Sequence, residues 1–329
     1  MKPYKLLLLF GILFNQYCTA PEKNKPSQYN EIFRQDIPLE KQIAQGHQPD
    51  CQTVAALKYM ALKKPESLRR MPQKDGESYV AHFPRLDTRK VADLDPNFDY
   101  KITEVRVSEE DLTDFRRWYG YSGSVGQDVI EAGLVKRKLK DEGSKNRKVS
   151  SVRDYTDYIG RNETSFLVDA ENALFILTGE AYEDIESGKI RDLYLISSLT
   201  KAETWKKWKF ERKIKNLLRT GKIAIASAYP EYVENGRLVP YHDSGRIAAF
   251  GYDIETNHGY AVVYNEEQDN VTLHNPWNHF EPQTQGDDQD DGVFTLTIEE
   301  FLTRFTNFYT KTEGISRSNA KNLNSANSR

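Results

Sequence analysis

The chain contains a cysteine, a histidine and an asparagine in settings that support nucleophilic acyl transfer. Cys51 opens a segment with helical spacing, and unpaired amides and the helix dipole stabilise a thiolate at a helix N-terminus. Asp50 precedes it and is a suitable N-cap residue. The cysteine count alone does not separate a reactive thiol from an inert buried one, but these neighbours favour a nucleophile.

The histidine and asparagine flank a predicted β-hairpin with strands at 258–264 and 271–275. If its turn centres on 266–267, His258 faces Asn275 across the hairpin, and a register slip of two residues keeps the same face. Asn275 then accepts a hydrogen bond from one imidazole nitrogen while the other nitrogen faces the thiolate. The apolar pairs expected on that face are Tyr260 with Leu273 and Val262 with Val271.

A fourth residue, Gln45, lies six positions before Cys51. Its side-chain amide, with the backbone N–H of Cys51, could hold the oxyanion of a tetrahedral intermediate. Taken alone, a glutamine here is a solvated loop residue. Its assignment as an oxyanion donor depends on the presence of Cys51, His258 and Asn275.

These pieces, in this order, resemble the catalytic core of calpains. They are Gln45-Gly46-x-x-x-Asp50-Cys51, His258-x-Tyr260-x-Val262 and Asn275-Pro276-Trp277. The resemblance runs from about Asp36 to Tyr309. Further matching stretches are Ala173-Leu174-x-x-Leu177-Thr178-Gly179, Leu218-Arg219-Thr220-Gly221-Lys222, Asp291-Gly292-Val293-Phe294 and Glu299-Glu300-Phe301-Leu302.

The resemblance implies an α+β, papain-like fold of two lobes with the active site in the cleft between them. A helical lobe (about 36–180) would carry Cys51, and an antiparallel β-rich lobe (about 181–310) would carry His258 and Asn275. By matched position, Gln45 is the oxyanion donor and Trp277 shields the histidine and asparagine from water. The implied activity is a cysteine endopeptidase that acts on protein or peptide substrates through an acyl thioester.

The sequence departs from the calpain pattern at three positions that shape the cleft. Pro49 replaces glycine, Gln52 replaces tryptophan, and Asn278 replaces the glycine after Asn-Pro-Trp. These departures bear on specificity and efficiency more than on mechanism. The stretch after Tyr309 is too short for the calcium-binding accessory modules of animal calpains, so we expect a catalytic core without them.

The first twenty residues predict export. Lys2 and Lys5 precede a short apolar run at 6–14, which is typical of a secretion signal and too short to span a membrane. Cleavage after residue 20 and a lipoprotein signal (1–17) with lipidated Cys18 both remain open, and we favour the second slightly. The protein would then be anchored to a membrane in the cell envelope, and otherwise secreted.

Outside the expected catalytic domain, residues 21–35 are predicted to be a polar tether and 311–329 a disordered tail. The expected helices cover 51–63, 125–139, 170–177, 204–218 and 298–308. The expected strands cover 79–83, 100–107, 222–229, 246–252, 258–264, 271–277 and 292–297.

Charged segments suggest two further hypotheses. The 46 basic and 49 acidic residues give a net charge of −3, which predicts no nucleic-acid partner. An acidic run offers oxygen ligands for calcium; its residues are Asp287, Asp288, Asp290 and Asp291. A solvated turn fits this run equally well, and the expected reaction requires no cofactor.

The helix at 204–218 has a basic face beside Trp205 and Trp208. A membrane surface could bind there, but the core stripe of this helix favours a solvated outer face.

Two other functions compete with hydrolysis of peptides. A papain-like acyltransferase would use the same acyl-enzyme with an amine acceptor. A surface lipoprotein or adhesin on a decayed peptidase scaffold would need no catalysis, and the intact set of Gln45, Cys51, His258 and Asn275 argues against it.

Overall fold

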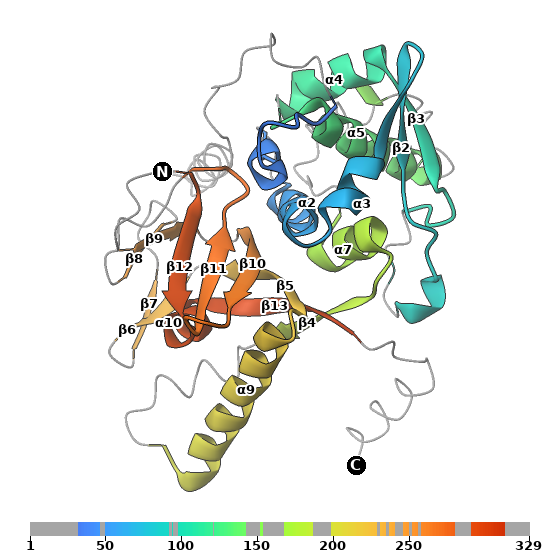
Figure 1. Cartoon of the computed structure of the whole chain (residues 1–329). Helices are drawn as coiled ribbons and strands as arrows, with labels where there is room; N and C mark the ends of the chain where they lie inside the picture. The colour runs from blue at the N-terminus through green and yellow to red at the C-terminus, as the bar shows by residue number, and fades with distance from the viewer. Residues whose placement is uncertain are drawn as a thin grey trace, which may run out of the picture.

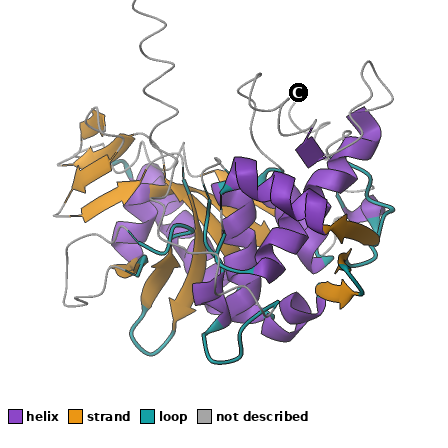
Figure 2. Cartoon of the chain, turned by 90° about the horizontal axis from the view of Figure 1, so that it is seen from above, coloured by secondary structure: helices purple, strands orange, loops and turns teal. Residues whose placement is uncertain are grey.

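The computed structural model describes residues 32–46, 50–91, 94, 98–120, 122–142, 152–153, 168–186, 199–228, 231–234, 237–240, 246–249, 252–255, 258–279 and 291–312. In this part of the chain, most helices gather on one side and most strands on the other (Figures 1 and 2). We call residues 39–178 the helical half and residues 182–311 the sheet half. The predictions for the signal segment, Cys18, most of the tether, Pro49 and the tail beyond 312 lie outside the described residues, as do those for Asp287, Asp288 and Asp290.

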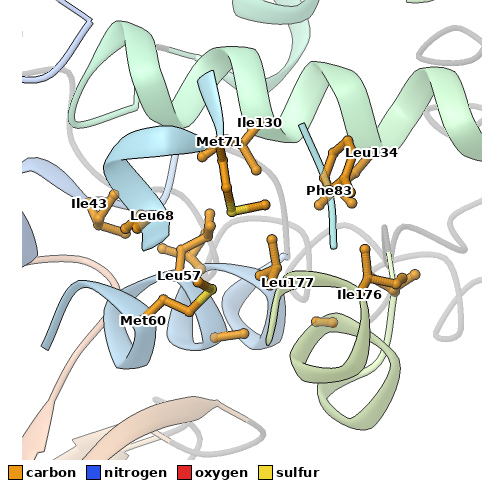
Figure 3. Close-up of a cluster of buried hydrophobic side chains, with 14 of the residues drawn as sticks. Ile43, Leu57, Met60, Leu68, Met71, Phe83, Ile130, Leu134, Ile176 and Leu177 are labelled. Carbon is orange, nitrogen blue, oxygen red and sulfur yellow. The ribbon is translucent and has the colours of Figure 1, made fainter. Parts of the chain in front are cut away.

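The helical half packs several helices and a small sheet around one apolar cluster. Leu57, Leu68, Ile130 and Leu177 come from four different helices and are each no more than 1% exposed (Figure 3). The helices are α2 (Cys51–Lys63), α3 (Pro65–Arg70), α4 (Glu109–Tyr119), α5 (Val125–Glu142) and α7 (Ala170–Thr178), with short 3-10 turns η2 (Leu39–Gln42) and η3 (Thr88–Lys90). The antiparallel sheet is β1 (Pro72–Asp75), β2 (Ser78–His82) and β3 (Glu104–Ser108).

Local sequence signals explain where these helices begin and end. The Ser108 side chain accepts from the Asp111 N–H, and Asp111 in turn accepts from the Ser108 N–H, which forms a capping box for α4. Asp169 caps α7 through the N–H of Asn172, and Gly179 ends that helix with a positive φ of 74°.

The sheet half is built on a six-stranded antiparallel sheet in the order β12-β11-β10-β5-β13-β4. These strands are β4 (Tyr182–Glu186), β5 (Ile223–Ala228), β10 (Gly259–Asn265), β11 (Asn270–His274), β12 (Val293–Thr297) and β13 (Phe305–Lys311). The half also contains α9 (Lys201–Arg219), α10 (Ile298–Arg304) and the hairpins β6 (Glu231–Glu234)–β7 (Arg237–Pro240) and β8 (Arg246–Ala249)–β9 (Tyr252–Glu255). The mixed α+β class with antiparallel sheets agrees with the sequence prediction.

Helix α2 joins the two halves. It packs against α7 on one side and against β10 and β5 on the other (Figure 1). Its first ten residues are buried except Gln52, which is partly exposed. The helix that begins with Cys51 is therefore held between the two halves, and its first turn faces the start of β10.

Two sequence predictions in the sheet half are wrong. The helix predicted over 298–308 ends at Arg304, and Phe305–Lys311 form β13 between β5 and β4. The strand predicted over 246–252 is instead the β8–β9 hairpin. In the first case, pairing on both edges of β13 overrides a local pattern that also fits a helix.

Candidate active site

His258 and Asn275 lie in contact at one end of the β10–β11 hairpin. His258 directly precedes β10 and Asn275 directly follows β11, and His258 Nε2 is 2.9 Å from Asn275 Oδ1. Both residues are almost fully buried, at 2% and 1% exposure. The structure thus brings together two residues that the sequence placed at the same end of a hairpin.

The predicted register of this hairpin is wrong by two residues. Val262 pairs with Leu273 and Tyr264 with Val271, which places the turn one residue later than expected. The turn is set by the Asn265 side chain, which accepts hydrogen bonds from the N–H groups of residues 267 and 268. Since a slip of two preserves the face, His258 remains a diagonal neighbour of Asn275.

Neighbouring hydrogen bonds fix the orientation of the Asn275 amide. Its Nδ2 donates to the His279 carbonyl oxygen at 3.0 Å, and its Oδ1 accepts from the Trp277 N–H at 3.0 Å. Oδ1 therefore faces His258 as an acceptor, so His258 Nε2 must carry a proton. In the neutral imidazole, Nδ1 is then the basic nitrogen.

Burial keeps this imidazole neutral. It lowers the pKa of His258 from 6.5 to about 4, and the hydrogen bond to Asn275 offsets only part of that effect. The Trp277 ring, itself 5% exposed, lies against the imidazole with a centroid distance of 4.5 Å. A neutral histidine with a basic Nδ1 can take a proton from a thiol beside it.

Cys51 is the first residue of α2, carries a thiol outside any disulfide, and is 3% exposed. The first turn of its helix touches the start of β10. A Cβ built on Gly259 would lie 3.5 Å from the Gln52 Cα, so the residue after His258 abuts the residue after Cys51. The Gln52 side chain accepts from the Ala170 N–H at 3.0 Å and ties α2 to the start of α7.

Asp50 occupies the N-cap position of α2, but its side chain makes no capping hydrogen bond. Its carboxyl group instead contacts that of Glu131 on α5, and both residues are 2% exposed. Burial raises the pKa of Asp50 to about 7 and that of Glu131 well above its usual range. One proton shared between the two carboxyl groups satisfies both, since two charges cannot be held there together.

Gln45 is 2% exposed and lies beside the asparagine loop, because its N–H donates to the Pro276 carbonyl oxygen at 2.8 Å. The backbone packs so tightly here that a Cβ on Gly46 would come within 1.8 Å of the Tyr119 carbonyl oxygen. Gln45 thus joins the segment before α2 to the segment after β11, and Gly46 abuts the end of α4.

Asn278 reinforces the same junction. Its φ is +56°, and its Nδ2 donates to the carbonyl oxygens of Lys41 at 3.2 Å and Ile43 at 3.0 Å. Its Oδ1 accepts from the buried ammonium group of Lys58 on α2. Burial lowers the pKa of Lys58 to about 7. We call Asn278 and Lys58 the clasp.

Sequence reasoning missed the clasp and Glu131. Asn278 was noted only as a departure from glycine, and a buried lysine in a helix has no local signature. The one signal for Glu131 is an acidic residue within an otherwise apolar stretch of α5 (Val125–Glu142).

Of the acidic run, only Asp291 lies within the described residues. It accepts from the Val293 N–H at 3.0 Å and lies 3.4 Å from the Lys41 ammonium group. The described residues hold no cluster of three or more metal-ligating side chains. The calcium hypothesis stays a prediction.

Comparison of the chain with protein-family models gave no match, and comparison with curated proteins gave none either. Among the helices in the described ranges, none has the length and apolar character needed to cross a membrane.

Proposed function

We propose that the protein is an exported cysteine endopeptidase of the calpain-like, papain-fold type. The observation that carries the proposal is the 2.9 Å contact between His258 Nε2 and Asn275 Oδ1, next to a helix that begins with Cys51. A structural histidine would not need an oriented asparagine, a shielding tryptophan and a thiol at a helix N-terminus together.

In the proposed reaction, His258 Nδ1 takes the proton of the Cys51 thiol as sulfur attacks the peptide carbonyl carbon. The Cys51 N–H and the Gln45 side chain stabilise the oxyanion. The imidazolium then protonates the leaving amine, which leaves an acyl thioester on Cys51. Water attacks this thioester with His258 again as base, releases the acid and restores the thiol.

Covalent labelling with an epoxide inhibitor of cysteine peptidases tests the nucleophile. Mass spectrometry of the labelled full chain should place one adduct on Cys51, and Cys51→Ala should take up none there. His258→Ala is the matched control, because it keeps the thiol but should label far more slowly. If Cys51 stays unlabelled in the folded protein and reacts only after unfolding, the result would support a decayed peptidase scaffold instead.

A fluorogenic peptide assay separates hydrolase from acyltransferase. A hydrolase releases the reporter without added amine, whereas a transferase needs an amine acceptor for turnover and forms an amide product. Adding a chelator to the same assay tests calcium, which we expect to be a modest modulator at most.

The N-terminal prediction has its own test. Mass spectrometry of protein from its native cell should find a lipidated N-terminus at Cys18 or an unmodified one at Pro21. An intact Met1 on that protein would contradict export.

A further inference from the structure

Helix α9 exposes two tryptophans on its outer side. Trp205 and Trp208 are 55% and 48% exposed and are the exposed large hydrophobic residues of the described chain. The helix buries only Ile214 and Leu218, both in its C-terminal half. Its N-terminal half projects beyond the sheet (Figure 1). Folding therefore leaves both tryptophan rings about half exposed on the surface of this helix.

Trp205 lies opposite the buried stripe, and Trp208 lies about 60° around the helix from Trp205. Successive residues of an α-helix turn by about 100°, so Trp205 and Ile214, nine positions apart, lie about half a turn from each other. Arg212 and Lys209 lie on the same side as Trp205, while Phe210 packs inward against Phe308 with ring centroids 6.5 Å apart. We call the side centred on Trp205 the outward face.

The outward face is basic and has no acidic residue. The helix sequence carries eight lysines and arginines and two glutamates. Glu203 lies off this face and caps the helix at Thr200, and Glu211 also lies off it, half-buried and 3.8 Å from Lys207. The exposed basic residues of the outward face are Lys201, Lys209, Arg212 and Lys213. Arg219, at the C-terminal end of the helix, bonds to Tyr264 near Asp269 and Glu266 instead. This concentration of positive charge contrasts with the net charge of −3 for the whole chain.

Cation–π contacts order the exposed tryptophans. The Lys209 ammonium group lies 4.0 Å from the Trp205 ring centroid, and the Arg212 guanidinium lies 5.2 Å from that of Trp208. Each pair presents an apolar ring beside a positive charge. At a bilayer surface, tryptophan rings settle at the level of the headgroups, and lysine and arginine contact anionic lipids.

We infer that the outward face of α9 binds the surface of an anionic lipid bilayer, with the helix axis parallel to the membrane. A single convex face with aromatic and basic residues fits a flat anionic interface. A protein partner would be expected to meet a groove or an apolar cluster, and single-stranded nucleic acid a basic groove lined by aromatic residues. The inference does not depend on the proposed peptidase activity.

Vesicle co-sedimentation of the full chain tests this inference. Wild-type protein should bind vesicles that contain about 30% phosphatidylglycerol more tightly than pure phosphatidylcholine vesicles, and salt should weaken that binding. Lys209→Gln/Arg212→Gln should reduce binding about 25-fold, since each basic residue near such a surface contributes about fivefold. Trp205→Ser/Trp208→Ser should also weaken binding and abolish the blue shift of tryptophan fluorescence on vesicle addition.

The matched control is Lys74→Gln/Lys101→Gln, which removes two exposed basic residues from the helical half and should change binding less than twofold. Every variant keeps the apolar N-terminal run, so any binding through that run is the same in all. Equal binding to both vesicle types, or binding unchanged in the α9 variants, would overturn the inference. So would binding to heparin without binding to vesicles.

Discussion

Asn278 Nδ2 lies 3.0 Å from the carbonyl oxygen of Ile43, 235 positions earlier in the chain. With its bond from Lys58, this contact holds the loop after Asn275 against the segment before α2. Glycine would suit the positive φ of +56° at this position better, so asparagine must act through its side chain.

Asn278→Gly should therefore fold but lose the clasp. We expect the free energy of unfolding to fall by about 1–3 kcal/mol, since several buried hydrogen bonds are lost and only a little backbone strain is relieved. Turnover should fall through kcat more than through KM, because the spacing of Cys51 and His258 would loosen. Urea unfolding and peptide turnover measure the two effects separately.

Asn278→Asp is the matched variant, since it keeps the acceptor for Lys58 and removes the donor to Lys41 and Ile43. It should lose at least as much activity as Asn278→Gly, because a carboxylate would face two carbonyl oxygens. Native stability and turnover in both variants would show that the clasp has no positioning role.

Local patterns predicted only some of the elements that local sequence determines. Helix α4 was missed despite its capping box, and the strand predicted over 100–107 is limited to β3 (Glu104–Ser108). The helix predicted over 51–63 is α2 (Cys51–Lys63), and the helix predicted over 170–177 is α7 (Ala170–Thr178). Strand β13 was missed because Phe305, Phe308 and Tyr309 satisfy helical spacing as well. Pairing with β4 and β5 decides its conformation, and no window of sequence contains that information.

In the candidate site, too, some contacts were predictable from local sequence and others were not. The contact between His258 and Asn275 was predictable because it depends on one hairpin, and its geometry survives an even slip of register. The Asp50 side chain was expected to cap α2, but it contacts Glu131 on a distant helix instead. A sequence shows neither which buried groups meet nor that their burial forces them to share a proton.

Gly46 should tolerate no side chain. The Cβ of Gly46→Ala would lie 1.8 Å from the Tyr119 carbonyl oxygen, and the atoms it would meet belong to backbone rather than to a flexible side chain. We expect the unfolding free energy to fall by about 3 kcal/mol or more, beyond the usual cost of overpacking. Gly259→Ala is the control, because its Cβ would meet ordinary contacts at 3.5 Å and beyond. Thermal unfolding that is equal in the two variants would contradict this prediction.

Asp50→Asn should change how stability depends on pH. The pKa of Asp50 is 3.8 when unfolded and about 7 when folded, so the folded state binds more protons between these values. Its stabilising contribution is therefore complete below pH 3.8 and is lost as pH rises through about 7, at up to about 1.4 kcal/mol per pH unit. The variant has no such titration, so its unfolding free energy should fall less than that of the native protein from pH 4 to pH 8.

Asp128→Asn provides the contrast for that experiment. Asp128 is buried 2.6 Å from the Arg116 guanidinium, which is a partner for its charge. Burial raises the pKa of this carboxyl group, and Arg116 and the Ser122 hydroxyl group oppose that rise. Removing that charge should cost about 1.5–3 kcal/mol at pH 7. If Asp50→Asn were as destabilising as Asp128→Asn at pH 7, the Asp50 carboxyl group would be ionised and paired, and the shared proton would be excluded.

Alanine substitutions in the site should lower turnover by amounts that depend on the role of each residue. Cys51→Ala should abolish turnover, and His258→Ala should nearly do so because proton transfer fails. Gln45→Ala removes one oxyanion donor and should lower kcat by roughly 100- to 1000-fold while still allowing an epoxide to react. Asn275→Ala should fall between His258→Ala and Gln45→Ala, since the imidazole loses its orientation but keeps its chemistry. Circular dichroism checks that each variant is folded, and more than trace turnover by Cys51→Ala would refute the nucleophile.

The acidic limb of the pH profile of kcat/KM should reflect the protonation of the His258 imidazole. Only the neutral form can take the thiol proton, and burial sets its pKa at about 4, so activity should rise as pH increases through about 4. Asn275→Asp would place a carboxylate against Nε2, where it favours the imidazolium and raises that pKa. The limb of this variant should therefore move to higher pH, whereas a merely structural Asn275 would leave its position unchanged. Initial rates of peptide hydrolysis from pH 3 to pH 8 measure the shift. An acidic limb that stays in place in Asn275→Asp would mean that the contact between His258 and Asn275 does not govern the proton transfer.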